Sequence, residues 1–184
     1  MCWHPENMED VKMSFLRGRE VHLSVILIIA LLGVLSGWAI GCNIPMRPEN
    51  NMPAFWGLLL NNVKVGGMVI VAGLLTLGVG ALFLVGFNMM ILGASTAGVY
   101  ATSGIGPILS GVLPHAPCEI VAMVMCALVG FEGWRVIAIF KERLVSGECV
   151  KFNVKSTAFL VLGAIVMYVL AALLESGISH AQTG

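Results

Sequence analysis

Charged residues are scarce in this sequence. Only 11% of its 184 residues are Asp, Glu, Lys or Arg, whereas an ordinary soluble domain carries about 25%. Hydrophobic residues make up 58% of the chain. With so few charges to solvate a surface, the remaining apolar surface must face lipid. The formal net charge is +0, so no overall field points to nucleic acid as a partner. The sequence predicts an integral membrane protein.

Motifs of the common enzymes and metal sites are also missing. The five cysteines show no CxxC spacing, which argues against a disulfide framework and against a structural zinc site. They are Cys2, Cys42, Cys118, Cys126 and Cys149. The HExxH pattern of zinc proteases, the GxSxG elbow and a phosphate-binding glycine-rich loop with lysine do not occur. The sequence therefore predicts no catalytic residue, no metal, no cofactor and no enzymatic activity.

Long apolar runs are present instead, and they predict an all-α bundle of five transmembrane helices. We place these helices at about residues 22–42, 55–84, 88–102, 118–140 and 157–174. Residues 1–21 form a polar N-terminal segment and residues 176–184 a short tail. The first run also resembles the core of a signal peptide, with AIGC as a weak cleavage box, but it is longer than a typical signal core.

The longest uncharged stretch, from Val65 to Pro114, is too long for one crossing. Its polar break is Asn88, so we expect the chain to turn back at residues 84–88. The segment of residues 103–114 is rich in Gly and Pro, and we expect a loop or a short re-entrant segment there.

Basic residues near the helix ends predict the orientation, because Lys and Arg concentrate on the cytoplasmic side. Two segments are basic, the N-terminal one and the one between the fourth and fifth helices. They contain Lys12, Arg17 and Arg19, and Arg135, Lys141, Arg143, Lys151 and Lys155. The opposite side holds only Arg47 and Lys64. An odd number of helices puts both basic segments on one side, so we expect a multi-pass protein of the cell membrane with a cytoplasmic N-terminus and an outer tail.

Glycines recur at helical spacing in the apolar runs. Gly33, Gly37 and Gly41 lie on one face of the first helix, where small residues let helix backbones approach closely. We expect this face to pack inside the molecule, with a homodimer as the alternative. The other glycines assigned to helix packing are Gly66, Gly67, Gly93 and Gly130.

His115 and Glu119 are the most prominent polar pair. They are four residues apart and share a face if the segment is helical. An imidazole with a carboxylate can bind a metal or shuttle a proton. A structural role is favoured over both, with His115 bonded to loop carbonyls and Glu119 at the helix start.

Other polar residues are expected to hold the bundle together. Asn61, Asn62 and Asn88 need hydrogen-bond partners in lipid, so we expect them to join helices to one another. Glu132 and Arg135, three residues apart, are candidates for an ion pair on one helix face. The favoured alternative is that the Arg135 side chain snorkels to the membrane interface.

The order of these polar residues resembles the stage II sporulation protein M family. Members of that family resemble one another in a paired Asn before a Gly-rich helix, an Asn followed by Leu-Gly, and a His-Gly-x-x-Glu motif. The matching residues here are Asn61, Asn62, Gly66 and Gly67, then Asn88, Leu92 and Gly93, then His115, Glu119 and Gly130. The resemblance covers residues 55–135. Met89 and Ala116 stand where the family usually has Gly, so the resemblance leaves the turn geometry at these two positions open.

The resemblance implies a non-catalytic membrane subunit. The family's namesake is similar to a membrane anchor that works with peptidoglycan-degrading partners, and some relatives occur beside ABC-transporter parts in circular-bacteriocin gene sets. We therefore expect a scaffold or accessory subunit. Its partners would be the lipid bilayer and either peptidoglycan-remodelling proteins or ABC-transporter subunits.

Two other functions compete with the scaffold. One is a small transporter subunit, because the Gly/Pro-interrupted segment near His115 resembles the broken helices of substrate sites. The other is an intramembrane enzyme that uses His115, Glu119 and Cys118. The enzyme is the least favoured, because no set of nucleophile and base meets the usual geometric demands.

Overall fold

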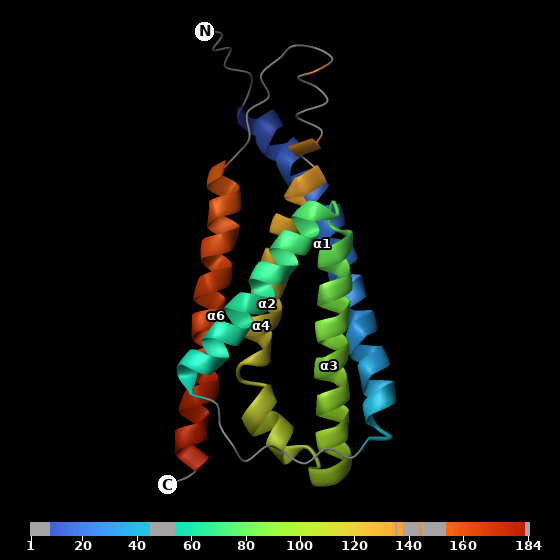
Figure 1. Cartoon of the computed structure of the whole chain (residues 1–184), viewed down its shortest axis with the longest axis vertical. Helices are drawn as coiled ribbons and strands as arrows, with labels where there is room; N and C mark the ends of the chain where they lie inside the picture. Colours follow the sequence, from blue (N-terminus) through green and yellow to red (C-terminus); the bar gives the residue numbers. More distant parts are fainter. Residues whose placement is uncertain (1–7, 45–53, 135, 138–143, 145–153, 183–184) are drawn as a thin grey trace.

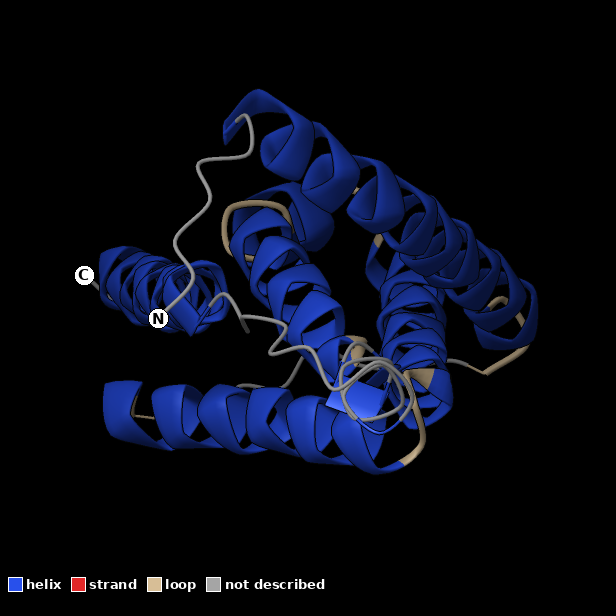
Figure 2. Cartoon of the chain, turned by 90° about the horizontal axis from the view of Figure 1, so that it is seen from above, coloured by secondary structure: helices blue, strands red, loops and turns tan. Residues whose placement is uncertain are grey.

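The computed structural model describes residues 8–44, 54–134, 136–137, 144 and 154–182. In this part of the chain every regular element is helical, and the end-on view in Figure 2 shows helices without a strand. The long helices are α1 (Met8–Gly41), α2 (Phe55–Leu75), α3 (Val79–Ser103), α4 (Ala116–Gly130) and α6 (Val154–Gln182), and η1 (Ile108–Val112) is one π-helical turn.

Five helices of the described residues are long and apolar enough to cross a membrane. Their apolar spans are Arg19–Gly41, Phe55–Leu75, Val79–Ser103, Ala116–Trp134 and Val154–Gly177. The shortest holds 19 residues, which at about 1.5 Å per residue nearly matches a hydrocarbon core of about 30 Å. The predicted all-α bundle of five transmembrane helices is confirmed, whereas the cytoplasmic location of the N-terminus stays a prediction.

Successive helices run in opposite directions, which gives the bundle two ends (Figure 1). We call the end with the start of α6 the Arg19 end, and it also holds the turn between α2 and α3. We call the opposite end, with η1 and the start of α4, the His115 end. α3 ends and α4 begins at the His115 end. The segment of residues 103–114, expected to be a loop or a re-entrant segment, therefore starts and finishes at the same end of the bundle.

The turn between the second and third helices is not at residues 84–88, as predicted from the sequence. It lies at residues 76–78, where Leu77 and Gly78 have positive φ angles of 58° and 98°. The Gly78 amide donates to the Gly73 carbonyl at 2.7 Å, which closes the end of α2 as in a Schellman motif. Asn88 needs no turn, because its Nδ2 donates to the Leu84 carbonyl at 2.8 Å within α3.

Other helix boundaries differ from the prediction as well. The first helix begins at Met8 rather than at residue 22, and the last continues to Gln182 rather than ending at residue 174. Polar residues continue a helix where no proline interrupts it, and neither α1 nor α6 contains one. The predicted helix 118–140 corresponds to α4, which ends at Gly130 before a turn at Phe131. Residues 132–134 and 136–137 are helical again, and residues 135 and 138–140 lie outside the described residues.

The glycine face of α1 packs against α3, and these two helices lie side by side along their length (Figure 1). A Cβ added at Gly37 would lie 1.9 Å from the Met90 carbonyl oxygen, and one at Gly41 would lie 2.2 Å from the Ala94 carbonyl oxygen. From α3, Gly93 meets the backbone of Val34 in the same way. This packing is within one chain, so the glycine face of α1 is not free for a second copy.

The other assigned glycines divide into packed and open positions. Gly66 faces Tyr168 and Cys126, and a Cβ at Gly130 would lie 3.0 Å from the Gly73 Cα. Gly67, in contrast, is exposed and has nothing within 4 Å of an added Cβ. It has no packing partner in the described part of the chain.

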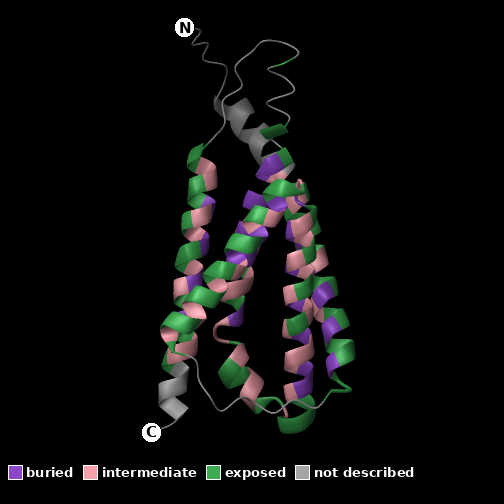
Figure 3. Cartoon of the chain, viewed as in Figure 1, coloured by how far each residue is buried: buried purple, intermediate pink, exposed green. Residues whose placement is uncertain are grey.

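Buried residues form a narrow core of mostly small and medium side chains, together with Tyr168 (Figure 3). Ile26, Val69 and Val85 are its largest fully buried members. In four of the five spans most residues are not buried, and many of those that are exposed are apolar. The span of α4 is more buried because this helix lies against both α2 and α6. The bundle therefore has lipid-type surface around a small core.

Candidate functional site

Three ionisable side chains meet at the His115 end. His115 directly precedes α4, and Pro117 in the first turn favours the helix start there. Glu119 lies in the same first turn, where the helix dipole favours a carboxylate. Glu175 reaches the pair from α6, with its Oε2 4.0 Å from His115 Nε2. One potential ligand atom from each of the three side chains lies within 4.8 Å of those from the other two. We call His115, Glu119 and Glu175 the carboxylate–histidine cluster.

The carboxylate–histidine cluster is partly shielded from solvent. The His115 side chain is 14% exposed and that of Glu175 is 30% exposed. The Nδ1 atom of His115 is buried and has no hydrogen-bond partner in the described part of the chain. The sequence-based role for His115, bonding to loop carbonyls, is therefore wrong for this nitrogen.

Asn62 connects the cluster to α2. Its Nδ2 donates to Glu119 Oε1 at 2.6 Å, a short bond of the kind that a charged acceptor makes. One carboxylate oxygen of Glu119 is thus occupied, and its orientation is fixed between α2 and α4.

A cavity of about 250 Å³ lies beside the cluster, between α2, α3, α4 and α6. Several polar side chains line it together with apolar ones, and Glu119 is common to the cavity and the cluster. The polar lining residues are Asn61, Asn62, Asn88, Ser95, Glu119 and Tyr168. We call this space the polar cavity. It is large enough for several water molecules or a small solute, since one water takes about 30 Å³.

Four of the five polar residues singled out in the sequence line the polar cavity, and the fifth, His115, adjoins it through the cluster. Their expected role as links between helices holds for Asn62, which bonds across to Glu119. Asn88 bonds within its own helix through Nδ2, and Asn61 is exposed. These residues therefore surround the polar cavity, and only Asn62 among the three asparagines links two helices through a hydrogen bond in the described part of the chain.

Met89 and Ala116, which replace the family's usual glycines, do not lie in turns. Met89 is buried in the middle of α3 and Ala116 is buried at the start of α4. Both positions are regular helix, where a Cβ is tolerated.

Three polar members of the site were not predicted from the sequence, namely Glu175, Tyr168 and Ser95. The helix predicted for residues 157–174 ends before Glu175, but this residue is half-buried inside the span of α6. An acidic residue within an apolar run was the signal, because ionisable residues in membrane helices are costly and usually functional. Tyr168, 3% exposed, gave no such signal, because a lone Tyr is common in apolar helices.

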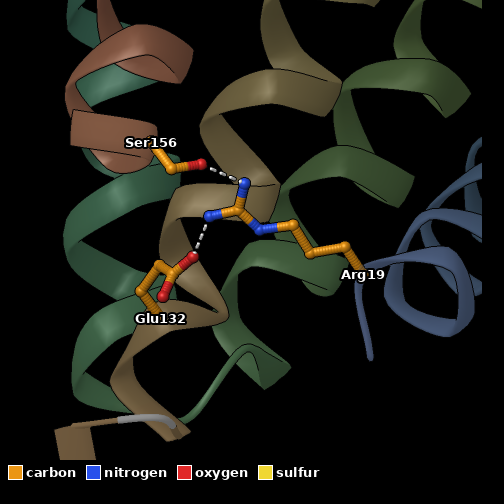
Figure 4. Close-up of polar contacts among 3 residues, drawn as sticks. All are labelled: Arg19, Glu132 and Ser156. Carbon is orange, nitrogen blue, oxygen red and sulfur yellow. Dashed lines mark hydrogen bonds and ion pairs between the residues drawn. The ribbon is translucent and has the colours of Figure 1, made fainter. Parts of the chain in front are cut away.

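A second polar contact lies at the Arg19 end (Figure 4). Glu132 is 3% exposed, and its Oε1 accepts a hydrogen bond from Nη2 of Arg19. Nη1 of Arg19 donates to the Ser156 hydroxyl at 2.7 Å. The predicted partner Arg135 lies outside the described residues. One arginine therefore joins α1 to the end of α4 and the start of α6. Spacing along the sequence could not indicate the Arg19–Glu132 pair, because the two residues are 113 positions apart.

Comparison with known proteins gives one result. A family model described as stage II sporulation protein M matches residues 23–180. This range includes every residue of the carboxylate–histidine cluster and of the polar cavity. No curated protein and no solved structure matches the chain. Because the matched range makes up most of the sequence and contains five candidate membrane spans, this multi-pass membrane protein belongs to the stage II sporulation protein M family.

Proposed function

We propose that this chain is a non-catalytic subunit of a multiprotein assembly in the bacterial plasma membrane. The observation that carries the proposal is its family membership over residues 23–180. The family resemblance implies a membrane anchor that works through partner proteins. Partners of two classes fit that role, peptidoglycan-remodelling proteins and ABC-transporter subunits.

The chemistry of the site supports a non-catalytic role. The His115 side chain forms no hydrogen bond with a hydroxyl or a thiol in the described part of the chain, and its near neighbour is the Glu175 carboxylate. A nucleophile needs a base within hydrogen-bond reach. An imidazole beside two carboxylates instead provides a site for a cation or a proton.

The distribution of apolar surface supports action through partners. In α2 only 17% of the span is buried within the chain, and in α1 and α3 only 22%. Helix faces of this kind can contact lipid or the helices of another membrane protein. Gly67, at an open position on α2, would allow a partner helix to approach closely.

Purification of the full chain from native membranes in a mild detergent tests the proposal. We expect a second polypeptide in a fixed stoichiometric ratio, either a peptidoglycan hydrolase or an ATP-binding subunit. A Gly67→Leu variant should lose most of that partner, whereas Gly37→Ala, which alters an internal contact, should reduce the yield of folded protein first. A chain that purifies alone and is active alone would contradict the proposal.

A small transporter subunit is the second candidate, and the polar cavity favours it. Its polar lining at membrane depth is typical of solute sites between transmembrane helices. The chain in liposomes would then conduct protons or K⁺, as reported by an ion-sensitive dye. Asn88→Ala should lower that flux and the exposed Glu20→Gln should not. If the unmodified chain shows no flux, and the purification from native membranes yields a stoichiometric partner, the scaffold is favoured over the transporter subunit.

A further inference from the structure

The carboxylate–histidine cluster combines donor atoms that metal ions use. We propose that His115, Glu119 and Glu175 form a binding site for one divalent transition-metal ion of the zinc class. Imidazole nitrogen and carboxylate oxygen are both common zinc ligands, and three protein ligands with one open position are typical of sites that also hold water.

The distances suit this role. Ligand atoms in a tetrahedral zinc site are about 3.4 Å apart, given bonds of about 2.0–2.2 Å. The three side chains already place one potential ligand atom each within 4.8 Å of the others. His115 Nε2 and Glu175 Oε2 are 4.0 Å apart. Small rotations about side-chain bonds therefore bring the set together without movement of α4 or α6.

The charge of the cluster favours a divalent cation. Glu119 and Glu175 would carry two negative charges when both bind a metal as carboxylates, and His115 is the one basic side chain paired with either of them in the described part of the chain. The start of α4 supplies roughly half a positive charge, and Lys64 is exposed and pairs with neither carboxylate. Uncompensated charge beside lipid is costly. One divalent cation neutralises the pair.

The surroundings show further features of a metal site. Asn62 holds one oxygen of Glu119, as outer hydrogen bonds do when they orient a ligand. The Nδ1 atom of His115 is buried without a partner, and so is the hydroxyl of Tyr168 in the adjoining polar cavity. A metal ion coordinated by Nδ1 would give that atom a partner, whereas coordination by Nε2 would leave it without one. Partial exposure of Glu175 provides access from the His115 end.

Metal binding to the intact chain tests the site. The protein is produced in detergent without a polyhistidine tag, stripped with a chelator and titrated with ZnCl₂ by calorimetry, and the bound metal is counted by elemental analysis. We expect about one Zn²⁺ per chain, lost in His115→Ala and in Glu175→Gln. An Asn62→Leu variant should bind Zn²⁺ about 10- to 100-fold more weakly, because it removes an outer hydrogen bond.

Matched controls separate this site from adventitious binding. His22→Gln removes a histidine that stacks on Phe131 at the other end of the bundle, and Cys118→Ser removes the nearest thiol in sequence. Both variants should still bind one Zn²⁺. Loss of binding in Cys118→Ser, or equal binding by Glu175→Gln and the unmodified chain, would overturn the proposed ligand set.

A stability measurement keeps the proposal testable if a variant folds poorly. Zn²⁺ should raise the Tm of the unmodified chain, because a ligand that binds the folded state stabilises it. Zn²⁺ should leave the Tm of the Glu175→Gln variant unchanged. This substitution preserves the shape of the side chain and removes its charge. Two results together would overturn the metal site: no Zn²⁺ binding by the unmodified chain, and a Tm of metal-free Glu175→Gln above that of the unmodified chain. They would show that the two carboxyl groups share a proton instead. Neither result bears on the partner-dependent role proposed above.

Discussion

At the scale of single residues, the buried Glu132 carboxylate shows how this chain handles charge in a membrane. Burial of an unpaired carboxylate is very unfavourable, and a close arginine offsets much of that cost. The Arg19 guanidinium bonds to Glu132 and to Ser156. The same side chain therefore neutralises a charge and joins three helices at one end of the bundle.

Removal of one partner of this pair should destabilise the fold. We expect Glu132→Ala to lower the free energy of unfolding by roughly 3–5 kcal/mol, the usual effect of leaving a buried charge unpaired. Thermal unfolding in detergent, followed by circular dichroism, measures the loss. The double variant Arg19→Met with Glu132→Leu should recover part of it, and the exposed Glu20→Gln should have no effect. A Tm of Glu132→Ala equal to that of the unmodified chain would refute the structural role of the pair.

At the scale of helices, close backbone contact determines how α1 and α3 pack. Their interface depends on glycines, because carbonyl oxygens of α3 occupy the space that a Cβ would need. Contacts of this kind gain dispersion energy over a long interface, which is one of the driving forces of helix association in lipid. The turn at Gly78 also leaves no room for a side chain, since a Cβ there would lie 2.3 Å from the Phe131 ring.

Alanine at Gly37 should therefore separate α1 from α3. A Cβ 1.9 Å from the Met90 carbonyl oxygen cannot be accommodated without movement of a helix, so we expect a clear fall in Tm, by several degrees or more. Gly67→Ala is the matched control, since an added Cβ there meets nothing within 4 Å. If the two variants unfold at the same temperature, α1 and α3 do not pack as described.

At the scale of the whole molecule, the alternation of five helices places the two ends of the bundle on opposite sides of the membrane. The basic segments at the N-terminus and before α6 predict that the Arg19 end is cytoplasmic. In that orientation we expect the carboxylate–histidine cluster to lie toward the outer side of the membrane.

Cysteine labelling in intact cells tests this orientation. With Cys42 as the single cysteine, exposed at the end of α1, a membrane-impermeant maleimide should label the chain from outside. A single cysteine introduced as Leu144→Cys, at a position 85% exposed, should react only after the cells are permeabilised. The reverse pattern would show that the N-terminus is outside.

Sequence by itself determined the number of spans and their approximate positions. The free energy of transferring a segment into lipid depends on its own composition and length, so a local sum identifies each span. The polar residues Asn62, His115 and Glu119 were also apparent, because ionisable and amide groups are rare in apolar helices. The turn at Gly78 was missed, since a tight turn between two helices needs no polar residue when glycine supplies the positive φ.

Only the tertiary structure decided which of these residues meet. Glu175 joins His115 from another helix, and Arg19 reaches Glu132 across 113 residues of sequence. Such pairs depend on the rotation and depth of each helix, which the glycine contacts of the whole bundle determine together. Hydropathy carries no information about that rotation. The spans could therefore be predicted from the sequence, whereas the carboxylate–histidine cluster exists only where α4 meets α6, and the polar cavity only where four helices pack around it.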